Sequence, residues 1–488
     1  MKQNSVYLFV ALICFSVSSC EKDPIGNVIS LHDDSAVPVS EWSRYDVTTH
    51  DAERYVKLHN PEKTYEMTSY VEGADTLLYV YNFSDGWVVL SGDRRVGPVI
   101  AESPTGRLDM NDEQGYVFWI RSNAENILAL KEDGPEIDNK SVRMWDMIAP
   151  VSMNKVPQTK AAYKKWVIRE FPINQKTTWE TEVPHLIQTK WGQEYPWNKS
   201  LPYVMTGFSF PYAEYEKCLI GCVAVASSQI LYYLHGKIGT PSILYHDVSW
   251  NIDILYRTDK IGFVRDSPIE NSPLWDEMAL NDSDYSDEEI NNVTNFMMDV
   301  GNRYETVYSS ANQGGSGALA EKHLTVLPRF FNITCYSSEY NKTIIRDQLL
   351  NGLPVLISAE YRMNDTGTSR HSWIIDGMLT RKIRYTMMRY VEYTNNWTSF
   401  DETYTTFSEA SNRYGFSDEY DIQTFIGSDD VTVESFLMNW GENGFGDDML
   451  YSADGGWVLE TIYGNSYFES NSGHLGKIYY GFKKNNDE

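Results

Sequence analysis

Three residues that lie far apart in the sequence have the side chains that thiol-based hydrolysis of an amide bond requires. Cys222 follows a glycine, His371 stands before an apolar run, and Asn439 ends another apolar run. A cysteine nucleophile needs a base, usually histidine, and a third group that orients the base. Taken singly, each residue also fits a structural role, because a lone cysteine is most often a buried core residue.

A helix is predicted to begin at Cys222, directly after the turn residue Gly221. A cysteine in the first turn of a helix lies at the positive end of the helix dipole, which stabilises the thiolate and lowers the thiol pKa below its usual ~8.5. Small residues along the helix allow it to pack closely against a neighbouring layer. The positions that share one face at helical spacing are Ala226, Gln229, Ile230 and Tyr233.

Two apolar runs are predicted to carry the other two residues as strands. His371 stands at the mouth of the run 372–377, where a strand would hold a base rigidly, and Asn439 follows the run 435–438. An asparagine carbonyl can accept the Nδ1–H of a histidine, and the adjacent Trp440 can shield that hydrogen bond from water. The chain order of cysteine, histidine and asparagine is typical of papain-type thiol peptidases.

These segments together resemble the streptopain-like cysteine peptidases, which are secreted bacterial enzymes with a papain-like core and an N-terminal propeptide. The resemblance covers roughly residues 45–485 in one order. It is carried by residues 86–94 (propeptide strands), 184–198 (opening segment), 221–229 (nucleophile helix), 299–301, 315–318, 370–377 (histidine strand) and 438–441 (Asn-Trp element).

The resemblance implies an α+β fold with a papain-like two-lobed core, one lobe helical and the other an antiparallel β lobe, preceded by a small α+β propeptide domain. It also implies a zymogen of an endopeptidase, in which Cys222 attacks the peptide carbonyl, His371 serves as acid and base, and Asn439 orients His371. Trp440 would cover their hydrogen bond, and the Gln193 side chain would join the Cys222 N–H in the oxyanion hole. Expected substrate-binding residues are Ser316, Gly317, Arg370 and Trp373. No metal or other cofactor is expected.

The resulting domain prediction follows the changes in composition along the chain. The segments are 1–19 (signal peptide), 20–45 (tether), 46–150 (propeptide domain), 151–180 (linker and activation region) and 181–488 (catalytic domain, with a β-rich insertion at about 380–432). Within the propeptide we expect helices over 51–59 and 115–130 and strands over 77–82, 87–91 and 99–101.

The N-terminus has the features of an export signal. The apolar run 6–15 after Lys2 is too short to cross a membrane, and it leads to residues 17–20, which resemble a bacterial lipoprotein signal that ends in the lipidated Cys20. The alternative is an ordinary secretory signal that is cleaved near Ser19. The lipoprotein reading predicts an exported protein anchored to the outer membrane or cell surface, from which processing could release it.

Lipidation of Cys20 and loss of Cys14 with the signal would leave three thiols, at Cys218, Cys222 and Cys335. An odd number in an exported protein means at least one unpaired thiol. A reversible bridge between Cys218 and Cys222, which would silence the enzyme, is one hypothesis for the extra cysteine.

The composition restricts the partners. The 488 residues carry a formal net charge of −27, which argues against a nucleic-acid-binding surface and against electrostatic docking on anionic lipids. A hydrophobic fraction of 42% allows a sizeable core. The expected partners are protein or peptide substrates and the protein's own propeptide, with membrane contact through the lipid alone and a monomeric state.

Two departures from the family pattern leave other functions open. Glu442 stands where the family usually has a second tryptophan, and Arg370 replaces a glycine before the histidine. The alternatives are a catalytically decayed surface lipoprotein that binds peptides or glycans, and an acyltransferase on the same fold.

Overall fold

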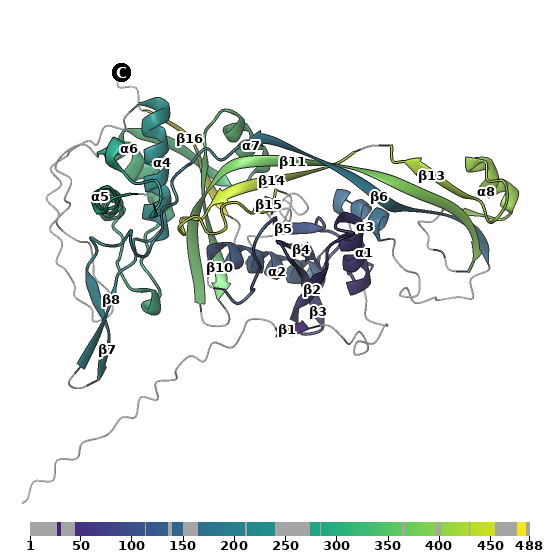
Figure 1. Cartoon of the computed structure of the whole chain (residues 1–488), viewed down its shortest axis with the longest axis horizontal. Helices are drawn as coiled ribbons and strands as arrows, with labels where there is room; N and C mark the ends of the chain where they lie inside the picture. Colours follow the sequence, from purple (N-terminus) through teal and green to yellow (C-terminus); the bar gives the residue numbers. More distant parts are fainter. Residues whose placement is uncertain are drawn as a thin grey trace, which may run out of the picture.

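The computed structural model of the chain places helices at one end of the molecule and a long β arm at the other (Figure 1). It describes residues 27–30, 44–112, 114–134, 139–149, 164–209, 212–239, 274–283, 285–363, 367–395, 397, 402–428, 430–453 and 476–484. The predicted signal peptide and Cys20 lie outside the described residues.

An N-terminal unit, residues 44–149, combines an antiparallel sheet with three helices. The central strand β4 (Trp87–Ser91) is an apolar run in which every residue is buried, whereas most residues of β2 (Tyr65–Glu72) are partly exposed. The predicted helices and strands of this unit are confirmed, with small extensions. The elements are α1 (Thr49–His59), β2 (Tyr65–Glu72), β3 (Asp75–Phe83), β4 (Trp87–Ser91), β5 (Val99–Ser103), α2 (Gly115–Asp133) and α3 (Lys140–Ile148), with β1 (Asn27–Ser30) paired to β2.

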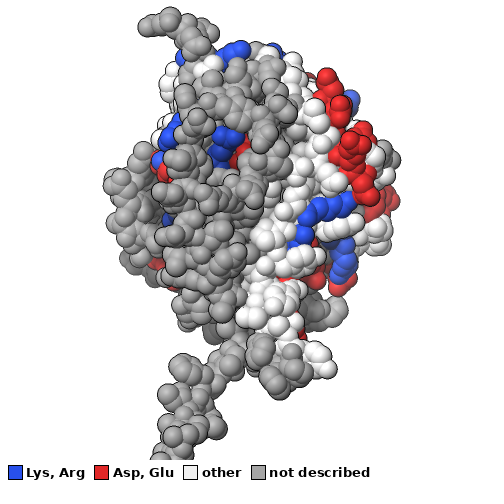
Figure 2. All heavy atoms as spheres, turned by 90° about the vertical axis from the view of Figure 1, so that its left-hand side faces the viewer, with Lys and Arg blue, Asp and Glu red and all other residues white. Residues whose placement is uncertain are grey.

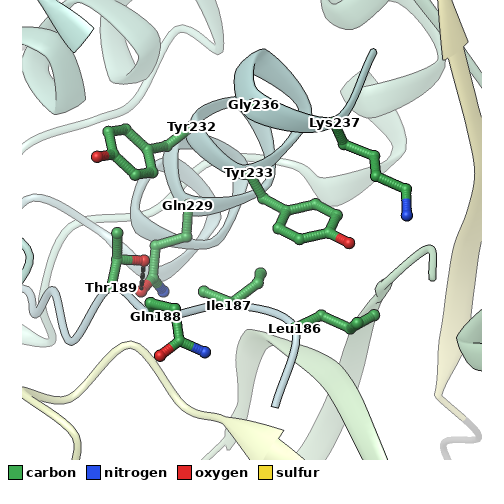
Figure 3. A pocket seen from close by; sticks show the side chains of 9 residues that line it. All are labelled: Leu186, Ile187, Gln188, Thr189, Gln229, Tyr232, Tyr233, Gly236 and Lys237. Carbon is green, nitrogen blue, oxygen red and sulfur yellow. Dashed lines mark hydrogen bonds between the residues drawn. The ribbon is translucent and has the colours of Figure 1, made fainter. Parts of the chain in front are cut away.

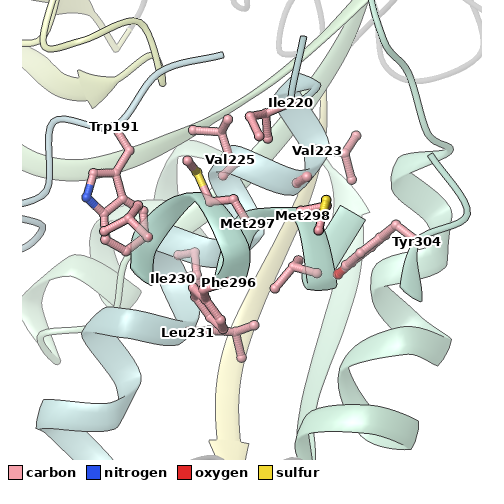
Figure 4. Close-up of a cluster of buried hydrophobic side chains, with 14 of the residues drawn as sticks. Trp191, Ile220, Val223, Val225, Ile230, Leu231, Phe296, Met297, Met298 and Tyr304 are labelled. Atoms are coloured by element: carbon pink, nitrogen blue, oxygen red, sulfur yellow. The ribbon is translucent and has the colours of Figure 1, made fainter. Parts of the chain in front are cut away.

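A helical lobe carries the helix that begins at Cys222. Its helices are α4 (Cys222–Ile238), α5 (Asp287–Arg303) and α6 (His323–Phe331), with short 3-10 turns at Trp275–Glu277, Ala311–Gln313 and Ala320–Lys322. Apolar side chains from α4 and α5 meet between the helices, where Ile230, Leu231 and Phe296 are fully buried (Figure 4). This packing fixes the direction of α4 and hence the position of its first residue.

A β lobe packs beside the helical lobe and carries the predicted histidine and asparagine strands. Its sheet runs in the order β5-β15-β14-β11-β10-β16-β9, and all six of these pairings are antiparallel. The expected α+β class with a helical and an antiparallel β lobe is confirmed. The elements are β9 (Ile333–Glu339), α7 (Lys342–Leu350), β10 (Val355–Met363), β11 (Gly367–Thr394), β14 (Val431–Asn439), β15 (Leu450–Ser452) and β16 (Lys477–Lys484).

One continuous sheet joins the N-terminal unit to the β lobe. Strand β5 pairs with the short strand β15, with Glu102 opposite Leu450 and Ala101 opposite Tyr451. The N-terminal unit therefore docks as additional strands on an edge of the β lobe's sheet rather than through a loop alone.

A two-stranded ribbon extends beyond the rest of the sheet and forms the arm (Figure 1). In it, β6 (Lys165–Val183) pairs with β11 from Met378 to Thr394. Of the predicted linker and activation region (151–180), residues 165–180 belong to β6, which pairs with β11 along its length, and residues 151–163 lie outside the described residues. Its role in activation stays a prediction. The predicted insertion forms the rest of the arm: β12 (Thr403–Tyr404), α8 (Phe407–Tyr414) and β13 (Ile422–Ile426).

The base of the arm shares a hydrophobic core with the N-terminal unit. Ile383 and Tyr385 of β11 are buried in the same cluster as Tyr55 and Trp145. The Tyr385 hydroxyl lies 3.0 Å from Nε2 of His59 at the end of α1. The arm thus supplies part of the interior of a unit that lies more than 230 residues earlier in the chain.

The helical end of the molecule shows an uneven distribution of charge. Acidic side chains gather along one margin of this end, with basic side chains beside them (Figure 2). A hairpin of β7 (Tyr203–Ser209) and β8 (Tyr212–Lys217) leads into α4. In the part of the chain that the structure describes, no helix combines the length and apolar character needed to cross a membrane.

Candidate active site

The predicted nucleophile occupies the first position of α4. Gly221, its N-cap residue, has φ of +92°, a left-handed conformation that favours glycine. A Cβ on Gly221 would also lie 3.3 Å from the Ser316 carbonyl oxygen. The turn into the helix therefore requires glycine, and it presents Cys222 at the helix N-terminus as the sequence predicts.

The thiol of Cys222 meets the strand that carries His371. Helix α4 packs against β11, and Cys222 lies against a buried cluster that includes Ile374 of that strand. The backbone N–H groups of Ser372, Val223 and Cys222 itself favour the thiolate and so lower the pKa of Cys222. Burial nevertheless raises the pKa of the Cys222 thiol, and the Glu442 carboxylate raises the pKa further. The predicted lowering of this pKa is wrong for the structure described here, because burial outweighs the backbone N–H groups and no imidazolium is present.

His371 lies inside β11, opposite Ala359 of β10, rather than at the mouth of a strand. Its ring is 7% exposed and stacks with the indoles of Trp373 and Trp440, at centroid distances of 5.8 and 6.0 Å. Nε2 donates to the Trp440 carbonyl oxygen at 3.1 Å. Burial lowers the pKa of His371 to about 4, so the ring is neutral at pH 7.

The N-terminus of α2, which belongs to the N-terminal unit, lies directly beside His371. The backbone N–H of Gly115 lies 2.9 Å from both carboxylate oxygens of Glu442. A Cβ on Gly115 would lie 2.9 Å from His371 Nε2 and 3.1 Å from Glu442 Oε1. Only a residue without a side chain fits here unless the histidine or the glutamate moves.

Asn439 is held by partners other than His371. Its Oδ1 accepts from Gln229 Nε2 at 2.8 Å and from the Gly441 backbone N–H at 3.1 Å, and its Nδ2 donates to the Thr189 carbonyl at 2.8 Å. The structure thus does not show the predicted hydrogen bond from His371 to Asn439. That role stays a prediction for a form in which Gly115 has left the histidine.

Trp440 is buried at the end of β14 and anchored at both of its polar ends. Its indole N–H donates to the Tyr451 hydroxyl at 2.9 Å, and its backbone N–H donates to Asp447 at 3.1 Å. The indole stacks on Trp373 at 4.8 Å. Trp440 is therefore held firmly beside His371, and its role in shielding a hydrogen bond between His371 and Asn439 stays a prediction.

The remaining predicted site residues lie around Cys222 at different depths. The Gln193 carbonyl accepts the Ile220 N–H at 3.0 Å, which ties Gln193 to the turn before the nucleophile. The Ser316 hydroxyl bonds to the Ser309 backbone, and Gly317 pairs with Val307. Arg370 is exposed beside His371. Trp373 is 2% exposed and supports the histidine, so it does not line an open cleft in this state.

A model of the peptidase C10 family matches residues 191–449, which contain all three predicted catalytic residues. The chain belongs to the peptidase C10 family. This is the streptopain family, so the predicted family membership and cysteine peptidase activity are confirmed. A model described as Spi protease inhibitor matches residues 39–127, and the protein is a C10 cysteine peptidase made as a zymogen with an inhibitory propeptide.

Solved structures of two related forms are similar to the chain. A fragment of prointerpain A from Prevotella intermedia is 18% identical, with a TM-score of 0.45, over 86% of this chain and 99% of that one. Active interpain A cysteine protease from Prevotella intermedia is 19% identical, with a TM-score of 0.33, over 61% of this chain and 95% of that one. No curated protein matches the chain.

Two residues that bind Asn439 in this C10 peptidase also line a pocket of about 280 Å³. Thr189 and Gln229 line it, and their side chains point toward each other and bond at 2.8 Å (Figure 3). Both residues also hold Asn439. Thr189 and Gln229 therefore hold the Asn439 side chain in place without any contact from His371.

Sequence reasoning did not assign roles to four residues that the structure places in or behind the site. Gln229 gave only the weak signal of a polar residue among small and apolar ones on a helix. Glu442 departs from the family pattern, but the sequence gives no indication of where its side chain lies in the site. Thr189 and the propeptide residue Gly115 gave no signal, since the contact between Gly115 and Glu442 joins residues 327 positions apart.

The other two described thiols lie away from the reacting groups. Cys218, Cys222 and Cys335 are all free, so the hypothesised bridge between Cys218 and Cys222 is not formed. Cys218 precedes α4 rather than sharing its helical path, and burial raises the pKa of its thiol to about 11. Cys335 belongs to β9, and its sulfur faces the helical lobe, 4.0 Å from the carbonyl oxygen of His323 in α6.

Proposed function

We propose that this C10 peptidase is an exported, lipid-anchored endopeptidase that cleaves peptide bonds with Cys222 as nucleophile and His371 as acid and base. The observation that carries the proposal is the packing of α4 against β11, which brings Cys222 close enough to Ser372, the residue next to His371, for its backbone N–H to lower the pKa of the thiol. Asn439, anchored at the end of β14, is the residue proposed to orient His371 in the active form.

The reaction begins when His371 takes the thiol proton from Cys222. The thiolate then attacks the carbonyl carbon of the scissile peptide bond, and the Cys222 backbone N–H and the Gln193 side chain donate to the developing oxyanion. As the tetrahedral intermediate collapses, the imidazolium of His371 protonates the leaving amine and an acyl-enzyme thioester remains. A water molecule, deprotonated by His371, hydrolyses the thioester and restores the thiol.

Latency follows from the same contacts. In the zymogen, His371 donates to the Trp440 carbonyl and lies against Gly115 of the propeptide. Burial depresses the pKa of His371 and raises the pKa of Cys222, so both groups are neutral at pH 7. A neutral thiol is a poor nucleophile. We infer that release of α2 allows the His371 ring to turn toward Asn439. The ring can then accept the thiol proton of Cys222, which gives an imidazolium and a thiolate.

The alkylation rate of Cys222 as a function of pH tests this proposal. In the intact zymogen, the rate of reaction with iodoacetamide should be low at pH 6 and rise continuously toward pH 9, because the thiol pKa is raised. After propeptide removal the rate should reach a plateau near pH 6, as in a thiolate–imidazolium pair. A Cys335→Ala background removes the other partly buried thiol. Identical pH profiles before and after processing would contradict the mechanism.

The lipid anchor is proposed from residues 17–20 alone. Cells that express the full chain with a labelled fatty acid should incorporate the label into the protein, and Cys20→Ser should abolish that labelling. Cys14→Ser is the matched control, because that residue leaves with the signal peptide. Equal labelling of the Cys20→Ser variant would reject the anchor, while export of an unlabelled protein would fit the ordinary secretory signal instead.

A further inference from the structure

Glu442 is an acidic residue within the active site whose partner in the zymogen is supplied by the propeptide. It sits two residues after Trp440, and the Gly115 backbone N–H is 2.9 Å from each of its two oxygens. Among the described residues, no lysine or arginine is one of the groups that shift the pKa of Glu442. Burial raises the pKa of Glu442 to about 7, so the carboxylate is held where a positive partner would stabilise it.

The group that Gly115 presents to Glu442 carries partial positive charge. Gly115 begins the 19-residue helix α2, whose N-cap residue Gln114 makes no side-chain cap and whose first turn has no acidic residue. The unpaired N–H groups at a helix N-terminus amount to roughly half a positive charge. Glu442 thus completes a helix end that its own sequence leaves uncapped, and α2 acts as a positively charged ligand.

A second acidic side chain adds to the negative potential at this point. Glu194, which is exposed, raises the pKa of Glu442 through the repulsion between the two carboxylates. It follows directly after Gln193, the proposed oxyanion-hole residue. Once the propeptide has left, Glu442 and Glu194 remain close together, and the positive end of α2 no longer offsets their negative charge.

The position of Glu442 relative to His371 indicates which part of a substrate it would meet. A Cβ on Gly115 would contact both His371 Nε2 and Glu442, so these two side chains flank the same point. In the proposed mechanism His371 protonates the leaving amine, which requires that amine to lie within hydrogen-bond reach of the ring. The segment that follows the scissile bond therefore passes Glu442.

We propose that Glu442 is a specificity-determining residue that, in the processed enzyme, binds a lysine or arginine side chain of the substrate on the leaving-group side of the scissile bond. This assignment rests on the proposed function of Cys222 and His371. An ammonium or guanidinium group would replace the Gly115 N–H with a stronger, charge-assisted hydrogen bond. Glu194 at the rim would attract the same cationic side chain before it is bound.

Matched peptide pairs test the assignment in the processed enzyme. Internally quenched peptides would differ only at the residue after the scissile bond, which carries lysine in one peptide and norleucine in the other. We expect kcat/KM to be about tenfold higher for lysine, since one charge-assisted contact of ~1.4 kcal/mol gives that factor. The lysine preference should fall as the salt concentration rises, because a partly exposed pair is screened.

Three variants separate the role of Glu442 from a general effect of charge. Glu442→Gln should bring the ratio of lysine to norleucine close to one, and Glu442→Lys should reverse it. Asp448→Asn removes the same charge from an exposed position of the same loop and should leave the ratio unchanged. An equal preference in the wild type and in Glu442→Gln would overturn the assignment.

The outcomes distinguish this inference from the proposed function. If the processed wild-type enzyme hydrolyses neither peptide nor any other, the proposed function fails and the assignment fails with it. If it hydrolyses both with no preference for lysine, the mechanism stands and the assignment alone is wrong. This comparison uses only the wild type, so it holds even if a variant does not fold.

Discussion

Replacing Cys222 with alanine is expected to reduce peptide hydrolysis by at least about 10⁴-fold, because the covalent route through the thioester is lost. The fold should survive, since alanine fits at the first position of a helix and the substitution removes only the sulfur atom. Hydrolysis of a fluorogenic peptide by the processed protein, with the melting temperature measured beside it, gives the result.

Cys335→Ala is the matched control for the loss of a thiol. Cys335 lies on β9 near His323 and takes no part in the proposed reaction, so this variant should keep near wild-type activity. Intact mass after incubation adds a second measurement. If the wild type removes its own propeptide, only Cys222→Ala should remain full length. Substantial turnover by Cys222→Ala would mean that another residue is the nucleophile.

Gly115→Leu is expected to weaken latency and to accelerate the appearance of activity by about tenfold, which corresponds to ~1.4 kcal/mol of lost docking energy. Any side chain at this position must displace His371 or Glu442, because its Cβ would lie within 2.9 and 3.1 Å of them. The substitution does not harm the helix itself, since leucine is a better helix former than glycine. The lost energy therefore belongs to the contact with the peptidase.

Gly97→Ala provides the control for a glycine replacement within the propeptide. A Cβ on Gly97 would meet only Ser141 Oγ, at 4.0 Å. The measurement is the lag before full peptidase activity after dilution of each purified zymogen, with its melting temperature recorded. If Gly115→Leu shows the same lag as Gly97→Ala, the contact between Gly115 and His371 does not maintain latency.

The sequence allowed the catalytic elements to be predicted because their signals are local. Cys222 is marked by a glycine before it and small residues after it, and the strands of His371 and Asn439 are short apolar runs with clear ends. The family resemblance then supplied the connection between these segments. Each of these signals lies within about ten residues, which is the range over which helix and strand patterns can be recognised.

The contacts that set the state of the site could not be predicted, because they join distant segments. Gln229 and Asn439 are 210 residues apart, and Gly115 and Glu442 are 327 apart. The raised pKa of Cys222 depends on burial by such neighbours and overrides the local effect of the helix dipole. Likewise, the charged and polar residues of β6 have no strand pattern of their own, and they form a strand only because β11 pairs with them.

The common interior of the arm and the propeptide has a consequence for activation. A cut in the chain between α3 and β6 removes the covalent link, but it leaves Tyr385 and Ile383 enclosed by Tyr55 and Trp145. Separation of the propeptide from the enzyme would expose these apolar side chains to water, and it would also break the pairing of β5 with β15. We therefore expect a severed propeptide to stay on the enzyme as a non-covalent subunit, so that full activity would require its destruction or displacement.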